Sequence, residues 1–230
     1  MRYINSFIIV VVLYSFISCG KNTNTSNTIE GEIIYSIAYP NLDSNNIFFD
    51  MMPKTMDYTF SEDGTKSEIS AGMGLFKSSY IKLTNSENLF QTVKILNKKY
   101  QSSYTTETFL ALNPKYKGIA FEETVRDTLL NGYNCKVVKF NFPNDSTTRL
   151  VYYTTELGGE NPNAGTPFER IPGVMLKYTI ENFGVMMDFT ADEITTNKVD
   201  KTTFEISKDY AEVSPKELKA QIEAIFLVSE

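Results

Sequence analysis

Side chains able to catalyse a reaction are scarce in this chain of 230 residues, which contains no histidine. The sequence therefore lacks the commonest general base, the Ser–His and Cys–His pairs and the usual zinc ligand. Adjacent carboxylates occur at Glu122–Glu123 and Asp192–Glu193. Neighbouring side chains on a strand point to opposite faces, so neither pair converges on one substrate. We therefore expect no enzyme, no cofactor and no metal, and keep a carboxylate-based hydrolase as a less favoured alternative.

The two cysteines predict different chemistry. Cys135 lies in the strand-like run NCKVVKFNF, and we interpret it as a small core residue rather than a nucleophile. Cys19 follows Ser18 at the end of an apolar run, residues 7–17. That run fits the ~7–15 residues of a secretory signal and is shorter than the ~20 of a membrane-spanning helix. Residues 16–19 look like a bacterial lipobox, so we expect cleavage before Cys19 and its acylation. The alternative is a plain secretory signal with an incidental cysteine.

This interpretation divides the chain into a signal peptide (residues 1–18), a polar tether after the acylated cysteine (19–28) and one domain (29–230). No acidic cluster follows Cys19 to serve as a surface-export signal, so we expect a lipid-anchored envelope protein in the outer membrane, facing the periplasm. The net charge of −6 argues against a nucleic-acid partner, which favours a basic surface.

The body of the chain has the two-residue period of strands with one buried face. Alternating apolar residues occur in five runs: 33–39, 56–60, 138–142, 174–180 and 185–189. Turn sequences such as Asp63–Gly64 and Asn131–Gly132 separate them. About ten consecutive strands without intervening helices predict an antiparallel meander.

Two helices are expected. The first begins at Ser214, where Pro215 and Glu217 complete a capping box, and carries an apolar stripe of Leu218, Ile222, Ile225 and Phe226. A second, short helix is expected over Asn45–Met52, ended by Pro53.

Several stretches resemble a family of bacterial envelope lipoproteins known as domain of unknown function 4412, related to the GLPGLI family. They are NIFFDMMPKTMDYTFSEDGTKSEIS, EETVRDTLLNGYNCKVVKF, YYTTELGG, PFERIPGVMLKYTI and FEISKDYAEVSP. The resemblance implies a fold like the outer-membrane lipoprotein carrier. That fold class is mainly β: a strongly curved antiparallel sheet, or unclosed barrel, with a C-terminal helix and a short helical lid. The family has no assigned reaction.

Methionine-rich segments suggest where a ligand would bind, because methionine adapts to variable apolar partners. We expect the concave face to bind an apolar or amphipathic, lipid-like ligand, with residues 45–52 as a lid. The candidate ligand-binding residues are Phe48, Phe49, Met51, Met52, Met56, Met175 and Met187. The same methionines would also suit an ordinary core.

The alternative function is a structural or interaction lipoprotein without a small-molecule ligand. Its contacts would come from the Gly- and Pro-rich stretch LGGENPNAGTPFERIPG, residues 157–173, because long loops are often functional. The same stretch would also suit a disordered connector. The sequence names neither a protein partner nor a ligand.

Overall fold

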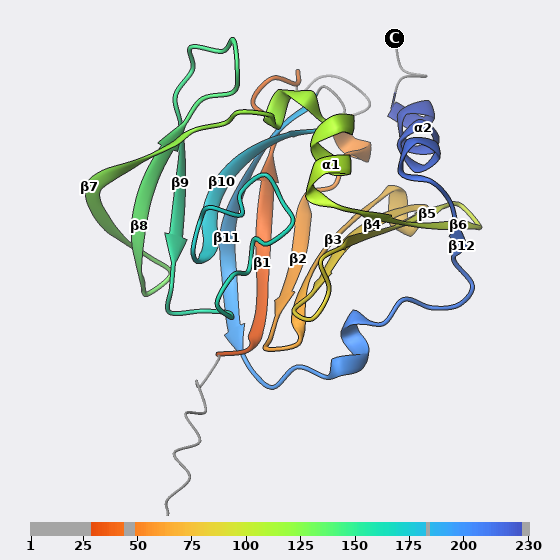
Figure 1. The fold of residues 1–230 in the computed structure, drawn as a ribbon, viewed down its shortest axis with the longest axis horizontal. Helices are drawn as coiled ribbons and strands as arrows, with labels where there is room; N and C mark the ends of the chain where they lie inside the picture. Colours follow the sequence, from red (N-terminus) through yellow and green to blue (C-terminus); the bar gives the residue numbers. More distant parts are fainter. Residues whose placement is uncertain (1–28, 44–48, 183–184, 227–230) are drawn as a thin grey trace, which may run out of the picture.

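The computed structural model describes residues 29–43, 49–182 and 185–226, and the side chains of residues 225 and 226 are not described (Figure 1). The predicted signal peptide, Cys19, the tether and Phe48 lie outside these ranges. Among the described residues, no helix is sufficiently long and apolar to cross a membrane.

The described strands form one twelve-stranded sheet in the order β12-β6-β5-β4-β3-β2-β1-β11-β10-β9-β8-β7. Every pair is antiparallel except β12 with β6. The strands are β1 (Gly31–Ala38), β2 (Thr55–Phe60), β3 (Gly64–Ala71), β4 (Phe76–Leu83), β5 (Leu89–Ile95), β6 (Lys98–Tyr104), β7 (Phe121–Leu130), β8 (Tyr133–Phe140), β9 (Arg149–Thr154), β10 (Val174–Asn182), β11 (Val185–Thr196) and β12 (Ala211–Glu212).

The topology consists of two meanders, β1–β6 and β7–β11, joined by the β1–β11 ladder (Figure 1). The prediction of a mainly β, mostly antiparallel fold is confirmed. The expected strong curvature is wrong, because the sheet is neither closed nor strongly curled. Register shifts occur in three separate ladders and not in the repeated pattern that bends a sheet into a barrel. β7 and β12 therefore remain as two open edges.

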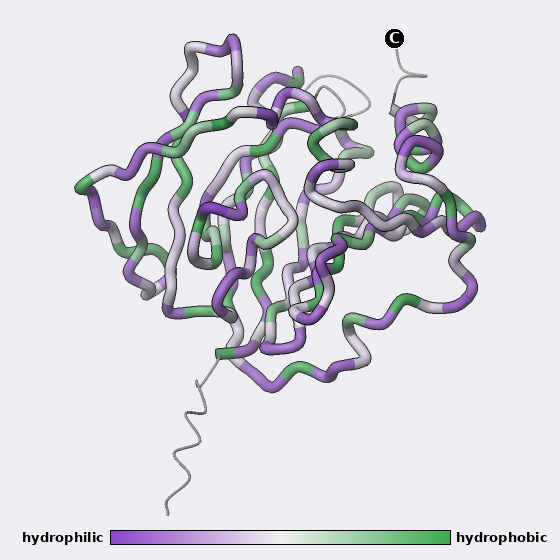
Figure 2. The backbone as a smooth tube through the Cα atoms, in the orientation of Figure 1, coloured by the Kyte–Doolittle hydropathy of each residue, from purple (hydrophilic) through white to green (hydrophobic). Residues whose placement is uncertain are grey.

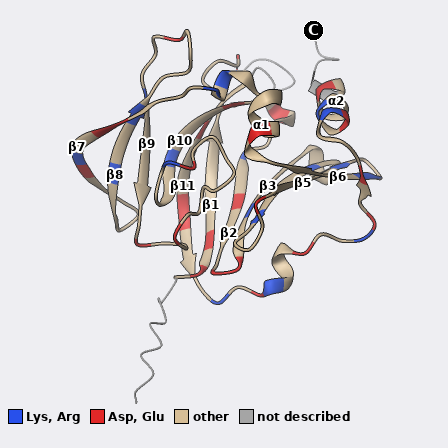
Figure 3. Cartoon of the chain, in the orientation of Figure 1, with Lys and Arg blue, Asp and Glu red and all other residues tan. Residues whose placement is uncertain are grey.

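The two faces of the sheet differ in character. We call the face that carries the buried Ile33, Tyr35 and Met56 the inner face, and the opposite face, with Glu32 and Asp57, the outer face. Hydrophobic and hydrophilic residues alternate along the strands in Figure 2. Figure 3 shows acidic residues along β1, β2 and β11. The centre of the sheet thus has one packed and one solvated face, as antiparallel sheets commonly do.

Several segments outside the strands cover the inner face. The β9–β10 loop (residues 155–173) lies in front of β10, β11 and β1 in Figure 1, and α1 (Thr106–Leu112) lies above it, followed by the 3₁₀ helix η3 (Pro114–Tyr116). The C-terminal helix α2 (Pro215–Phe226) packs Leu218 and Ile222 against Phe76 and Val93.

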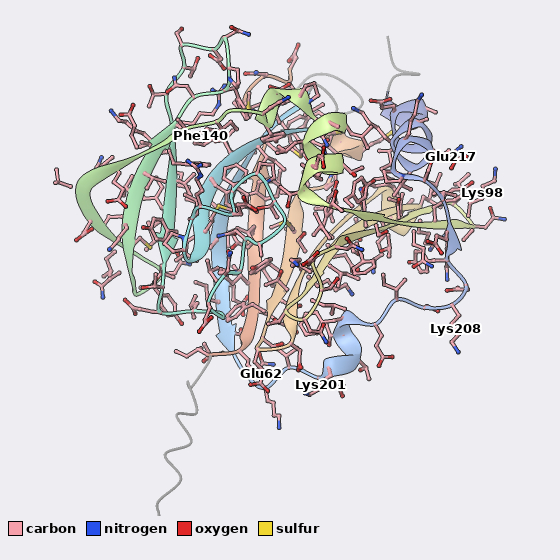
Figure 4. All side chains as sticks on the ribbon, viewed as in Figure 1. Glu62, Lys98, Phe140, Lys201, Lys208 and Glu217 are labelled. Carbon is pink, nitrogen blue, oxygen red and sulfur yellow. The ribbon has the colours of Figure 1, made fainter. Side chains whose placement is uncertain are left out.

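The predicted start of α2 is confirmed. The Ser214 amide donates to Glu217 Oε2 at 2.9 Å, and the Glu217 amide donates to Ser214 Oγ at 3.3 Å. This reciprocal pair is the capping box; Glu217 is labelled on α2 in Figure 4.

The other helical segments were not predicted, or only in part. α1 was not expected, although the Thr105 hydroxyl caps it by accepting from the Thr108 amide at 3.2 Å. Of the helix expected over Asn45–Met52, the structure shows a 3₁₀ turn, η1 (Phe49–Met51), while residues 44–48 lie outside the described ranges. Two further 3₁₀ helices are η2 (Gly72–Gly74) and η4 (Lys201–Phe204), and η4 contributes Phe204 to a cluster with Ile81.

Candidate functional site

A cavity of about 210 Å³ lies between the inner face and its covering segments. Its walls come from β2, β3, β4, β10 and β11, from α1 and η3, and from the β9–β10 loop. An engineered apolar cavity of about 150 Å³ binds benzene, so this space is sufficient for a ring or a segment of an alkyl chain.

The cavity follows strand β4. Phe76, Ser78, Tyr80 and Lys82 all line it, since every second side chain of a strand points to the same face. Phe76 and Lys82 are six residues apart, which corresponds to roughly 20 Å along an extended strand. The cavity is therefore elongated in the strand direction.

Aromatic side chains form much of the lining. Tyr178 stacks on Phe189 with ring centroids 5.0 Å apart and an interplanar angle of 9°, and both residues line the cavity with Tyr58, Tyr80 and Tyr116. Burial raises the pKa of all four tyrosine hydroxyls above the usual range, so they stay neutral at physiological pH. The lining thus offers ring faces and neutral hydroxyl groups.

The β9–β10 loop is a packed wall of the cavity. The side chain of Asn163, which is 5% exposed, donates from Nδ2 to the carbonyls of Ile171 at 2.7 Å and Gly173 at 2.8 Å. Phe168, which is 3% exposed, places its ring 5.7 Å from that of Phe140. The loop is therefore not the disordered connector that its composition allowed.

Two charged residues belong to the lining, Glu68 and Lys82, but they face opposite sides of the sheet. Glu68 follows Ser67 in β3, so its side chain points to the outer face. There it forms ion pairs with Lys77 at 2.6 Å and Lys66 at 3.5 Å. Burial opposes ionisation of Glu68, yet hydrogen bonds from Lys77 and Ser79 keep its pKa below the usual value. Its carboxylate is thus engaged on the outer face, and Lys82 carries the charge on the cavity side.

The structure brings four of the predicted ligand-binding residues together. Met52, Met56, Met175 and Met187 line the cavity. The remaining three are placed otherwise: Phe49 is half-buried against Tyr39, Met51 is 59% exposed, and Phe48 lies outside the described residues.

The sequence did not predict the tyrosine lining or the role of the β9–β10 loop as a packed wall of the cavity. Tyr58 and Tyr178 were visible in alternating runs, but only as core residues. The hydrogen bonds of the Asn163 side chain could not be predicted from a sequence pattern, because its partners lie 8 and 10 residues further along an irregular loop.

Cys135 and the acidic residues bear on two alternative chemistries, a cysteine nucleophile and a metal site. Cys135 is 0% exposed and burial raises the pKa of its thiol, which confirms the expected core residue and disfavours a nucleophile. Among the described residues, no group of three or more His, Cys, Asp or Glu side chains is arranged to hold a metal ion.

Comparison with known proteins shows similarity at the level of fold. No protein-family model matches the chain, and no curated protein sequence matches it significantly. Two structures of PNGF-II, from different crystal forms, superpose with TM-scores of 0.55 and 0.54 at 19% and 18% sequence identity. Each match covers 85% of this chain and 33% of the PNGF-II chain, so this chain spans about a third of that protein's length. At this identity, the likeness shows the fold alone.

Proposed function

We propose that this chain is a lipid-anchored envelope protein whose inner-face cavity binds an apolar or amphipathic, lipid-like ligand. The observation that carries the proposal is the elongated cavity of about 210 Å³ with its aromatic and methionine lining. Flexible methionine side chains adjust to apolar ligands of different shape. The neutral tyrosine hydroxyls add hydrogen-bonding groups without charge.

Membrane attachment through Cys19 and a periplasmic location in the outer membrane are part of the same proposal. They are supported by the lipobox-like residues 16–19 and the polar segment that follows. The relationship to the envelope lipoproteins of domain of unknown function 4412 is also proposed. The mostly antiparallel sheet with α1 and α2 on its inner face supports this relationship, although the sheet lacks the strong curvature expected, and η1 would be part of the short lid.

Ligand binding is tested with the fluorescent probe N-phenyl-1-naphthylamine and two matched variants. Ser67 and Ser70 lie on the same strand, but Ser67 lines the cavity whereas Ser70 is exposed on the other face. We expect saturable binding to the wild-type protein, at least tenfold weaker binding to Ser67→Phe because the ring fills the cavity, and unchanged binding to Ser70→Phe. Circular dichroism checks folding, since overpacking costs about 1–3 kcal/mol.

A wild-type protein without saturable binding would contradict the proposal, as would a folded Ser67→Phe variant with wild-type affinity. Native mass spectrometry of the purified protein gives an independent measurement. Clean apo protein together with a defined protein partner would favour the alternative, a structural or interaction lipoprotein.

Anchoring is tested by Cys19→Ala in cells fed a fatty-acid analogue. We expect the label to be lost and the precursor to stay uncleaved, because the variant lacks the thiol to which the first acyl group is attached. Label that persists in the variant would exclude acylation at Cys19.

A further inference from the structure

Lys82 is the only lysine or arginine among the described residues that line the cavity. It lies on the inner face of β4, in register with Ser78 and Tyr80. The tip of the β9–β10 loop lies beside it, since a Cβ atom built on Gly165 would be 3.5 Å from Lys82 Cε. Lys82 therefore occupies one end of the cavity, between the loop tip and the β4–β5 turn.

The ammonium group of Lys82 has one neutral partner and no ion pair within the described part of the chain. Its Nζ donates to the Ser86 carbonyl, and none of the ion pairs among described residues includes it. Burial lowers the pKa of Lys82, and the nearby Glu87 offsets this only in part. A partly buried cation with spare donors favours an anion next to it.

The opposite end of the cavity is apolar. Phe76 lines it there, and Met52, Met56 and Ile69 lie on the neighbouring segments of the lining. A charge at one end and a mainly apolar and aromatic lining over the remaining length suit a molecule with a polar head and a single apolar chain.

We propose that the ligand is an amphiphilic monocarboxylate, with its carboxylate at Lys82 and its chain running along β4 toward Phe76 and Met52. This inference rests on the proposed function of the cavity. One ammonium group matches one carboxylate charge, whereas a phosphate monoester carries about −1.5 to −2 at pH 7. A positively charged amphiphile is disfavoured by the same lysine.

The length of the cavity determines the chain length of the test ligands. Carbon–carbon bonds of about 1.5 Å give a rise of roughly 1.3 Å per carbon in an extended chain, so twelve carbons span about 15 Å. That length fits within the roughly 20 Å between Phe76 and Lys82. Dodecanoate and dodecan-1-ol have the same chain and differ in the charge of the head group.

The experiment measures displacement of N-phenyl-1-naphthylamine by the two compounds, below their micelle-forming or solubility limits. We expect dodecanoate to bind the wild-type protein about tenfold more tightly than dodecan-1-ol, a difference of ~1.4 kcal/mol. Lys82→Met keeps the length of the side chain and removes the charge, so it should abolish this preference by weakening dodecanoate binding about tenfold. Lys98→Met is the control, because Lys98 is exposed at the edge of the molecule (Figure 4).

The outcomes separate the inference from the function on which it rests. If both compounds displace the probe equally, or if Lys82→Met retains the preference for dodecanoate, the carboxylate assignment is wrong and cavity binding stands. If neither compound nor the probe binds, the proposed function itself fails. Equal loss of preference in Lys98→Met would show a general surface-charge effect and overturn the role of Lys82.

Discussion

Two segments of irregular structure line the cavity, and they are held in different ways. The β9–β10 loop buries Leu157, Phe168 and Ile171, which are 1%, 3% and 1% exposed. The segment 49–53 contains η1, which has no fully buried residue, and its Met51 is 59% exposed. The first segment is part of the core, and the second lies at its margin.

The contacts of the 49–53 segment are mostly local. Lys54 Nζ lies 3.5 Å from the centroid of the Phe49 ring and donates to the Phe49 carbonyl at 2.6 Å. The Phe49 ring meets Tyr39 edge-on at 6.1 Å. By contrast, Phe168 meets Tyr116, Phe121, Phe140 and Tyr178, which come from four different elements.

The two covers of the cavity are therefore expected to differ in mobility. Segments with few buried apolar contacts open at a lower free energy than segments embedded in the core. The 49–53 segment is therefore the better candidate for the proposed lid, and the β9–β10 loop suits a rigid wall. For residues 157–173, composition alone allowed either a contact loop or a disordered connector.

The largest effect is expected from removing the aromatic anchor of each segment. Phe168→Ala should lower the free energy of unfolding by about 3–5 kcal/mol, as for other fully buried aromatic residues. Phe49→Ala removes a half-buried ring and should cost about 1–2 kcal/mol. Urea denaturation of both variants measures the difference. Equal losses would refute the distinction between wall and margin.

A somewhat smaller effect is expected at Asn163. Asn163→Ala leaves the buried carbonyls of Ile171 and Gly173 without their side-chain donor, which should cost about 2–3 kcal/mol. Asn161 is exposed two residues earlier, and Asn161→Ala should change stability by less than about 0.5 kcal/mol. A loss below 1 kcal/mol at Asn163, measured in the same denaturation series, would show that the loop does not depend on this side chain.

Much of the fold was predictable because its signals are local. The alternation of apolar and polar residues predicted the buried side of β1, where Ile33, Tyr35 and Ile37 are all buried. The predicted turn at Asn131–Gly132 has the positive φ angles of a tight hairpin turn, 51° and 84°. The capping box located the start of α2. Each of these features depends on residues within a few positions of one another.

The unpredicted features depend on residues distant in the chain. The pairing of β1 with β11 joins residues more than 150 positions apart, such as Ser36 and Thr190, and no local pattern encodes it. The cavity combines β4 with the β9–β10 loop in the same way. The methionine-rich segments therefore predicted four lining residues, whereas the tyrosine hydroxyls and Lys82 could be assigned to the cavity only from the structure.

The smallest effect separates two adjacent methionines of the 49–53 segment. Met52 lines the cavity and is half-buried, whereas Met51 points to solvent, so the pair forms a matched test of the lid. Met52→Ala should weaken binding of N-phenyl-1-naphthylamine about fivefold, or ~1 kcal/mol, because part of the apolar contact with the ligand is lost. Its free energy of unfolding should fall by no more than about 1 kcal/mol, since Met52 is only half-buried at the margin of the core. Met51→Ala should leave both quantities unchanged, and titration and urea denaturation of the two proteins provide the measurements. A loss of several kcal/mol at Met52 with unchanged probe affinity would place the 49–53 segment in the core instead, and would remove the contrast between a rigid loop wall and a movable lid.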